Sequence, residues 1–283
     1  MKDSYALYRR AVDDVWKGWW VSWPLSGRIE VGQVLQNVDG SVRTAGSLSE
    51  RGAPFAPRPG TPHNAYTYDT QGSASLQFKA AGVAMDGLTA LAVADFGARV
   101  RFEKGDSALV VYRGLTETGV ADVRALAAAL VQRGWVEWDD TLLAVTDVVT
   151  AGSGIVLTAA ESGAVVELRL QAGVSQAQLG LADLAGRASV AWRRSVGLEW
   201  LGTDTTPFFR VARLRKNWFG KVKTDYGPRQ PGRGAAPVPV PPVLLEEAYD
   251  DPAAVLETVT SDEQPPPPDI SSVPSDEPST EAS

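Results

Sequence analysis

The last fifty residues constrain most strongly what this chain can fold into. Residues 234–283 contain eleven carboxylates, eleven prolines and no Lys or Arg, whereas residues 1–233 hold 27 basic and 23 acidic side chains. A segment of this composition buries too little apolar surface to offset the entropy lost on ordering. The sequence therefore predicts a basic folded body of charge +4 followed by an acidic interaction tail of charge −11.

The change in composition also sets the expected domain boundaries. We expect one globular domain over residues 1–219, a basic and then Pro-rich linker over 220–242, and a disordered acidic tail over 243–283.

The end of the body is basic and carries interleaved aromatic residues, a combination that binds anionic lipids or single-stranded nucleic acid. We do not expect a specific nucleic-acid partner. The predicted membrane or polyanion contact comprises Arg210, Arg213, Arg215, Lys216, Trp218, Lys221 and Lys223. The alternative is that the protein's own tail satisfies these charges, because a flexible polyanion tethered beside them lies within their field.

One apolar island interrupts the acidic tail. It holds the few apolar side chains of the tail, which suit a short docking motif that becomes helical when bound. The predicted docking residues are Leu244, Leu245, Tyr249, Val255 and Leu256. The first expected partner of the tail is therefore the body of the same chain.

The body itself has the pattern of an α+β domain with a twisted, largely antiparallel sheet and flanking helices. Apolar residues at helical spacing predict helices over residues 1–20, 120–133 and 176–186. Alternating polarity predicts a strand pair around the turn Asp39-Gly40, a β-hairpin over 94–113 that turns at 103–106, and a three-stranded meander over 142–171. Two further strands are expected over 190–201 and 208–214, and a Pro-rich loop over 50–63.

Catalytic and cofactor signatures are lacking. The chain has no cysteine and one histidine, His63, in a Pro/Gly loop, and it has no phosphate-binding glycine loop. We therefore expect neither enzymatic activity nor a metal or cofactor, and keep a carboxylate site formed only in the fold as a third alternative. The N-terminal residues are too charged for a signal peptide, and no run of eighteen uncharged apolar residues exists. The expected location is the cytoplasm.

A stretch near the N-terminus is similar to a known family. Residues 24–35 (PLSGRIEVGQVL), followed by residues 39–43 (DGSVR) and 46–48 (GSL), resemble the N-terminal strand region of bacterial gasdermins. The resemblance implies a body that assembles into a membrane pore once proteolysis removes a restraining C-terminal segment. Members of that family commonly carry a lipidated N-terminal cysteine, which this chain does not have.

Besides that carboxylate site, two functions remain open on the sequence. The first is a gasdermin-like pore-forming defence effector that is held inactive by its tail, with anionic membrane lipids, a protease and further copies of itself as partners. In this pore-forming function, the strands of 94–113 and 142–171 extend into the membrane, where a β-strand needs about 9–11 residues that alternate between apolar and polar. The second is a bacterial protein–protein interaction or adaptor module whose tail recruits a partner through Leu244–Tyr249.

Overall fold

The computed structural model describes residues 4–13, 15–79, 91–92, 95–134, 138–170, 184–185, 188–215, 217–218 and 239–267. The predicted helix over 176–186 lies almost entirely outside these residues. The helices are α1 (Ser4–Asp13), η1 (Thr70–Gly72), α2 (Val123–Gly134), α4 (Pro242–Asp250), α5 (Pro252–Val255) and η4 (Ser261–Glu263). The strands are β1 (Trp20–Val21), β2 (Gln33–Val38), β3 (Ser41–Ser47), β4 (Thr61–Pro62), β5 (Tyr66–Asp69), β6 (Ala74–Lys79), β7 (Gly97–Phe102), β8 (Ser107–Gly119), β9 (Leu142–Ala159), β10 (Val165–Leu170), β11 (Ala188–Arg194), β12 (Val196–Leu214) and β13 (Leu256–Val259).

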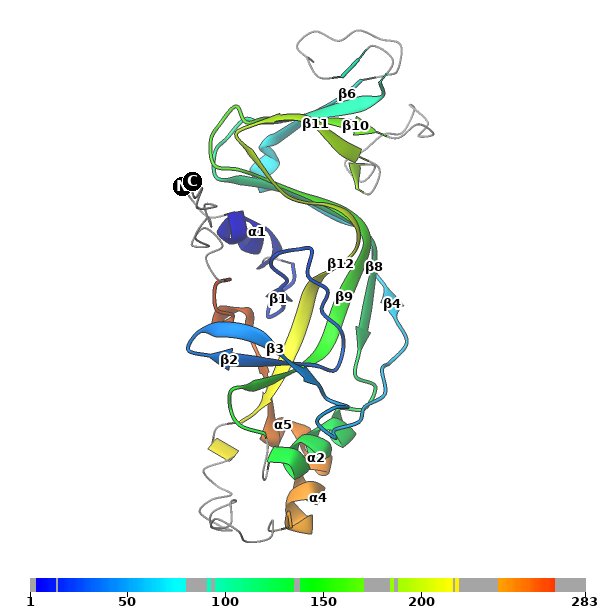
Figure 1. The fold of residues 1–283 in the computed structure, drawn as a ribbon, viewed down its shortest axis with the longest axis vertical. Coiled ribbons are helices and arrows are strands. Elements are labelled where there is room, and N and C mark those ends of the chain that lie inside the picture. Colours follow the sequence, from blue (N-terminus) through cyan, green and yellow to red (C-terminus); the bar gives the residue numbers. More distant parts are fainter. Residues whose placement is uncertain are drawn as a thin grey trace, which may run out of the picture.

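In the described part of the chain these strands form two antiparallel sheets. The main sheet has nine strands and runs β1-β12-β9-β2-β3, with β8 also on β9, β4 and β5 on β8, and β13 on β12. The upper sheet has four strands in the order β11-β10-β7-β6. The helices flank the main sheet, with α2, α4 and α5 gathered at the end opposite the upper sheet (Figure 1). The predicted α+β class with a largely antiparallel sheet is therefore confirmed.

The two sheets share four stretches of chain. Strand β5 leads through η1 into β6, β7 leads into β8, β9 into β10, and β11 into β12. Their neighbours are the same on both sides of the break, because β5-β8-β9-β12 in the main sheet corresponds to β6-β7-β10-β11 in the upper sheet. Each stretch is thus one long strand that bends once, and all four bend at one level (Figure 1).

Each bend contains a residue in the left-handed region of backbone space. The residues are Gln71 and Gly72 (φ 51° and 63°), Asp106 (φ 53°), Gly163 (φ 75°) and Ser195 (φ 57°). Neighbouring bends are hydrogen-bonded to each other, from Glu103 N to Ser73 O at 2.8 Å and from Gly163 N to Phe102 O at 2.7 Å. A non-glycine residue with positive φ is uncommon and costs about 1–2 kcal/mol. Three of these four bends therefore hold backbone strain.

The bends fold the upper sheet back onto the main sheet. One apolar cluster joins β7 and β10 of the upper sheet to β8 and β9 of the main sheet, through residues such as Val100, Leu168, Val111 and Leu157. The opposite face of β8 and β9 is covered by α1, whose Tyr8 hydroxyl hydrogen-bonds the Tyr112 hydroxyl at 2.9 Å. Burial on both faces explains why residues 108–111 of β8 are all aliphatic, and the one polar group of Tyr112 is paired with Tyr8.

This arrangement corrects two predictions. Residues 94–113 are not a hairpin, because β7 pairs with β6 and β10 while β8 pairs with β9, β4 and β5. Residues 142–171 are not a meander either, because β9 is one strand of 18 residues that never pairs with β10. At residues 103–106 and 161–163 the sequence of a sharp bend between two sheets resembles that of a turn within one sheet, which explains the predicted hairpin and the last predicted turn of the meander. Likewise, residues 190–201 and 208–214 belong to β11 and to a single strand β12 of 19 residues.

The N-terminal region also departs from its prediction. Helix α1 ends at Asp13 rather than near residue 20, and Gly18 adopts φ 76°. Trp20 instead enters the main sheet, where its partner is Phe209 on β12. The predicted turn Asp39-Gly40 is present between β2 and β3, with φ of 51° and 78°, and the predicted helix over 120–133 corresponds to α2.

Candidate functional site

The C-terminal segment, residues 239–267, occupies an edge of the main sheet. Strand β13 pairs with β12 in the register Val211↔Val259 to Leu214↔Leu256. Strand β1 pairs with residues 208–209 of β12, so β1 and β13 lie end to end along the same edge. A strand that covers an edge removes a row of unpaired backbone groups from solvent. At the start of the predicted acidic tail over 243–283, residues 242–263 form helices and a strand on the body, and residues 268–283 lie outside the described residues.

Apolar burial explains why this part of the tail is ordered. Leu244, Ala248, Val255 and Leu256 are buried in one cluster with α2, to which Leu126, Leu130 and Leu214 also belong. Leu245 is partly buried against the same cluster, whereas Tyr249 is 46% exposed. The structure therefore places four of the five predicted docking residues against the body. Fully burying one such aliphatic side chain contributes about 1.5–3 kcal/mol.

Carboxylates of the segment pair with the basic strand. Arg213 Nε lies 2.6 Å from Glu257 Oε1, and a second guanidinium nitrogen lies 2.8 Å from Glu263 Oε2. Burial lowers the pKa of Arg213, but its hydrogen bonds to the two glutamates outweigh this and raise the pKa above its ordinary value. Arg215 donates to the carbonyl of Ala253 at 2.8 Å and lies 3.9 Å from Glu257. Arg213 and Arg215, both part of the predicted polyanion contact, thus already bind groups of the same chain.

The other residues of that predicted contact do not gather on one surface. The guanidinium of Arg210 stacks over the Trp19 ring at 4.2 Å, a cation–π contact. Trp218 is buried in the cluster of α2 and α4. Lys216, Lys221 and Lys223 lie outside the described residues.

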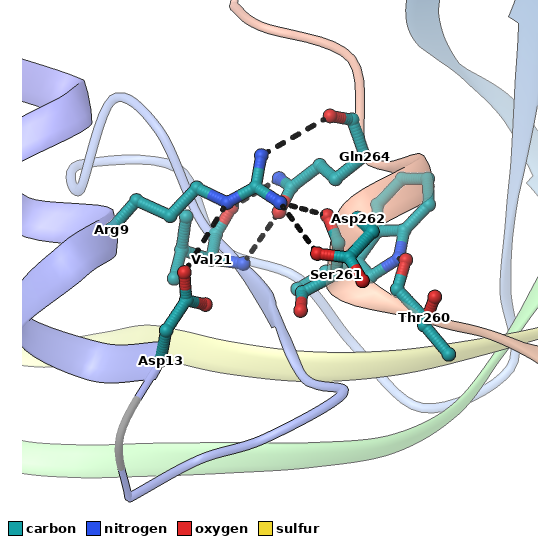
Figure 2. A network of polar contacts seen from close by, with 8 residues as sticks. Arg9, Asp13, Val21, Thr260, Ser261, Asp262 and Gln264 are labelled. Atoms are coloured by element: carbon teal, nitrogen blue, oxygen red, sulfur yellow. Dashed lines mark hydrogen bonds and ion pairs between the residues drawn. The ribbon is translucent and has the colours of Figure 1, made fainter.

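A polar clasp fixes the end of the segment to the N-terminal region (Figure 2). The Trp20 indole donates to the carbonyls of Val259 and Thr260, both at 3.0 Å. Arg9 on α1 donates to the carbonyls of Ser261 and Gln264. The Gln264 side chain accepts from Val21 N at 2.9 Å and donates to Val21 O at 2.7 Å, so it extends the pairing of β1 as a further strand residue would.

An aromatic groove begins where the clasp ends. Its cavity of about 180 Å³ is lined by Tyr5, Trp20, Trp23 and Phe209, by aliphatic residues such as Leu35, and by Gln264 and Pro265–Pro267. The rings of Tyr5 and Trp23 meet edge to face, with centroids 5.8 Å apart. Residues from α1, β1, β2, β3 and the tail all contribute to this groove.

Sequence reasoning missed the clasp and the groove. The signals were present, because four tryptophans cluster at residues 16–23 and Gln264 precedes four consecutive prolines. Neither sequence feature indicates which residues it contacts, because the clasp joins residues about 240 positions apart.

Comparison with known proteins adds no relative: no family model matches the chain, and no curated protein matches it. Among the described residues, no group of three or more His, Asp or Glu side chains is placed to hold a metal ion. None of the helices in the described ranges is long and apolar enough to cross a membrane.

Proposed function

We propose that this protein is a gasdermin-like, pore-forming effector whose C-terminal segment holds it in a closed form. The observation that carries the proposal is the set of four bent strands that form both sheets in the same order. Straightening the bends would convert them into one continuous antiparallel ribbon of four long strands. Self-association of such ribbons closes a β-barrel, the only sheet that spans a bilayer without unpaired edges.

The side chains of the upper sheet suit a barrel wall. Toward the main sheet it presents apolar residues such as Ala98, Val100 and Leu168, and the alternate positions of the same strands carry Arg101 and Arg169, both exposed. A membrane barrel needs one apolar face for lipid and one polar face for its lumen. The strands of the upper sheet have six or seven residues, which is short of the ~9–11 required. Joining each strand to its continuation in the main sheet supplies the missing length.

The C-terminal segment opposes this change in the proposed mechanism. It pairs with β12, one of the four bent strands, and its helices share a core with α2. While β13 and β1 cover the edge of β12 over residues 208–214, another copy of the chain has no free edge there to pair with. Cleavage near Gly234 would cut the covalent link and expose the edge after the segment dissociates.

The adaptor alternative has less support. It requires Leu244 to contact a partner, yet Leu244 is buried against the body. Within that predicted recruitment motif Glu246 and Tyr249 are exposed. A partner would have to withdraw the segment from the core before binding it.

The test is dye release from anionic vesicles by protein that folds intact and is cut afterwards. A specific protease site is inserted at Gly234, and release is compared before and after cutting. Truncation at Gly234 is a poorer experiment, because a body without Leu244 and Val255 lacks part of its core. Release that appears only after cutting supports the proposal. Cut protein whose segment has dissociated by size-exclusion chromatography, and which releases nothing, contradicts it.

A disulfide gives the matched control. Ala212 and Thr258 are directly opposed on β12 and β13, at a separation typical of antiparallel partners that a disulfide bridges. Since the chain has no cysteine, Ala212→Cys with Thr258→Cys forms the sole pair. Cut, oxidised protein should release no dye, and a reductant should restore release.

A further inference from the structure

We infer that the aromatic groove beside the clasp is a binding site for proline-rich peptides, which the protein's own residues Gln264–Pro267 occupy in part. The inference concerns binding alone and does not depend on the proposed pore. It rests on the groove lining, on the type of hydrogen-bonding groups around it, and on the sequence already seated there.

The lining matches the chemistry of proline recognition. Proline-rich segments adopt an extended, preformed helix and dock on aromatic surfaces. Here four aromatic residues, Tyr5, Trp20, Trp23 and Phe209, are among those that line the groove. Pro265 and Pro267 are partly buried at the rim, whereas Pro266 is exposed. About 180 Å³ of the groove stays open beside them, so the resident prolines do not fill it.

The polar groups around the groove are also of the required kind. A proline has a carbonyl to accept hydrogen bonds and no N–H to donate, so its site must present donors. Trp20, which lines the groove, and Arg9, which lies beside it in the clasp, have only donors. They bind the carbonyls of Val259, Thr260, Ser261 and Gln264, the last of which directly precedes the prolines. The glutamine that precedes the prolines fixes the register by pairing both main-chain groups of Val21.

The seated segment argues for what the ligand is. Residues 264–268 read Gln-Pro-Pro-Pro-Pro, and this is the longest proline run in the chain. A tethered ligand competes at an effective concentration in the millimolar range. A peptide added in solution should therefore bind weakly to the unmodified chain, and at least about tenfold more tightly once the resident segment is removed from the groove.

The experiment measures fluorescence anisotropy of a labelled peptide Gln-Pro-Pro-Pro-Pro, the sequence of residues 264–268. It is titrated with the full-length chain and with a full-length variant carrying Gln264→Gly and Pro265, Pro266 and Pro267 each replaced by Ser. A second peptide of equal length and charge has alanine at every proline. Thr44→Arg, added to the emptied variant, places a bulky cation at an exposed position of the groove lining.

The inference is supported if the proline peptide binds the emptied variant at least about tenfold more tightly than the unmodified chain, and if both the alanine peptide and Thr44→Arg abolish binding. It is overturned if an emptied variant with unchanged circular dichroism binds no peptide. Equal binding of the alanine peptide also overturns it, because the groove would then recognise apolar surface rather than proline. None of these outcomes depends on vesicle leakage, so the pore proposal is judged separately.

Discussion

Arg213 is the residue at which the basic strand and the acidic segment meet most closely. Its side chain is 19% exposed and contacts both Glu257 and Glu263. Removing one partner of a partly buried charged pair leaves the other without its hydrogen bonds. We expect Arg213→Ala to lower the free energy of unfolding by about 1–2 kcal/mol, measured by urea denaturation.

An exposed pair provides the control for this prediction. Arg28 and Glu30 lie 3.5 Å apart with both side chains 71% exposed, so Arg28→Ala should change stability by less than about 0.5 kcal/mol. A double-mutant cycle of Arg213→Ala with Glu257→Gln should also show coupling, since the two groups touch. Additive effects would mean that the pair contributes nothing to holding the segment.

Glu117 gives the protein a predictable response to acid. Burial raises the pKa of Glu117, but hydrogen bonds from Arg58 and His63 outweigh it, so the pKa lies below the ordinary value of 4.5. A depressed carboxyl pKa contributes stability that is complete above the ordinary value and is lost as the pH falls through the folded-state pKa. Unfolding measured from pH 7 to about pH 3 should therefore show a smaller acid loss in Glu117→Gln.

The comparison for Glu117 is Glu161, an exposed carboxylate at the third bend. Glu161→Gln removes the same charge without removing a contact to Arg58 or His63, so it isolates the effect of overall charge. An equal flattening in both variants would show that the acid response comes from overall charge rather than from the contacts of Glu117 with Arg58 and His63.

Single residues of the candidate site were partly predictable. Charge alone placed Arg213 and Arg215 near the acidic tail, because opposite charges tethered together attract at short range. The same reasoning failed for Trp218, which is buried in the core, since composition does not tell an exposed aromatic from a buried one. Gln264 was not predictable, because its role depends on Val21, a residue distant in sequence.

At the scale of elements, glycine was the misleading signal. The run Ala151-Gly152-Ser153 predicted a turn before a strand that starts at Gly154, yet all four residues lie inside β9. Side-chain space explains it: a Cβ on Gly154 would lie 2.5 Å from the Tyr112 ring and 2.8 Å from the Trp200 ring on the neighbouring strands. Glycine is needed there for close packing and not for chain reversal.

The bends carry a prediction of their own. Ser195 joins β11 to β12 with φ 57°, a conformation that glycine adopts freely and β-branched residues resist. We expect Ser195→Gly to be at least as stable as the unmodified chain. Ser195→Val should lose about 1–2 kcal/mol in urea denaturation.

Ser162 is the matched position for this test. It is exposed in the neighbouring bend and does not have positive φ. Ser162→Val should therefore change stability by less than about 0.5 kcal/mol. Equal losses at Ser162 and Ser195 would show that the left-handed conformation is not what makes the bend sensitive.

For the whole molecule, the α+β fold class was predictable from the sequence, but the packing of the upper sheet against the main sheet was not. Alternating polarity identifies strands, because it records which face of a strand is buried. It does not say which sheet buries that face. The pairing of β7 with β10 rather than β8 is set by contacts between distant segments, and no local pattern encodes them.

The proposed insertion makes a prediction at this same scale. Leu76 and Gln77 are adjacent on β6, opposite Val100 and Arg99 of β7. Leu76 packs toward the main sheet, whereas Gln77 is exposed. An environment-sensitive dye is attached to Leu76→Cys or to Gln77→Cys, each the sole cysteine of its variant. After cutting near Gly234 in the presence of anionic vesicles, the dye at 76 should shift to the emission of a lipid environment. The dye at 77 should stay in water, because neighbouring residues of a barrel strand face opposite sides of its wall.

Lipid-like emission from both positions would mean that the upper sheet lies flat on the membrane. Dye release with no change at either position would assign the pore to other strands, and the bends would then need a different explanation.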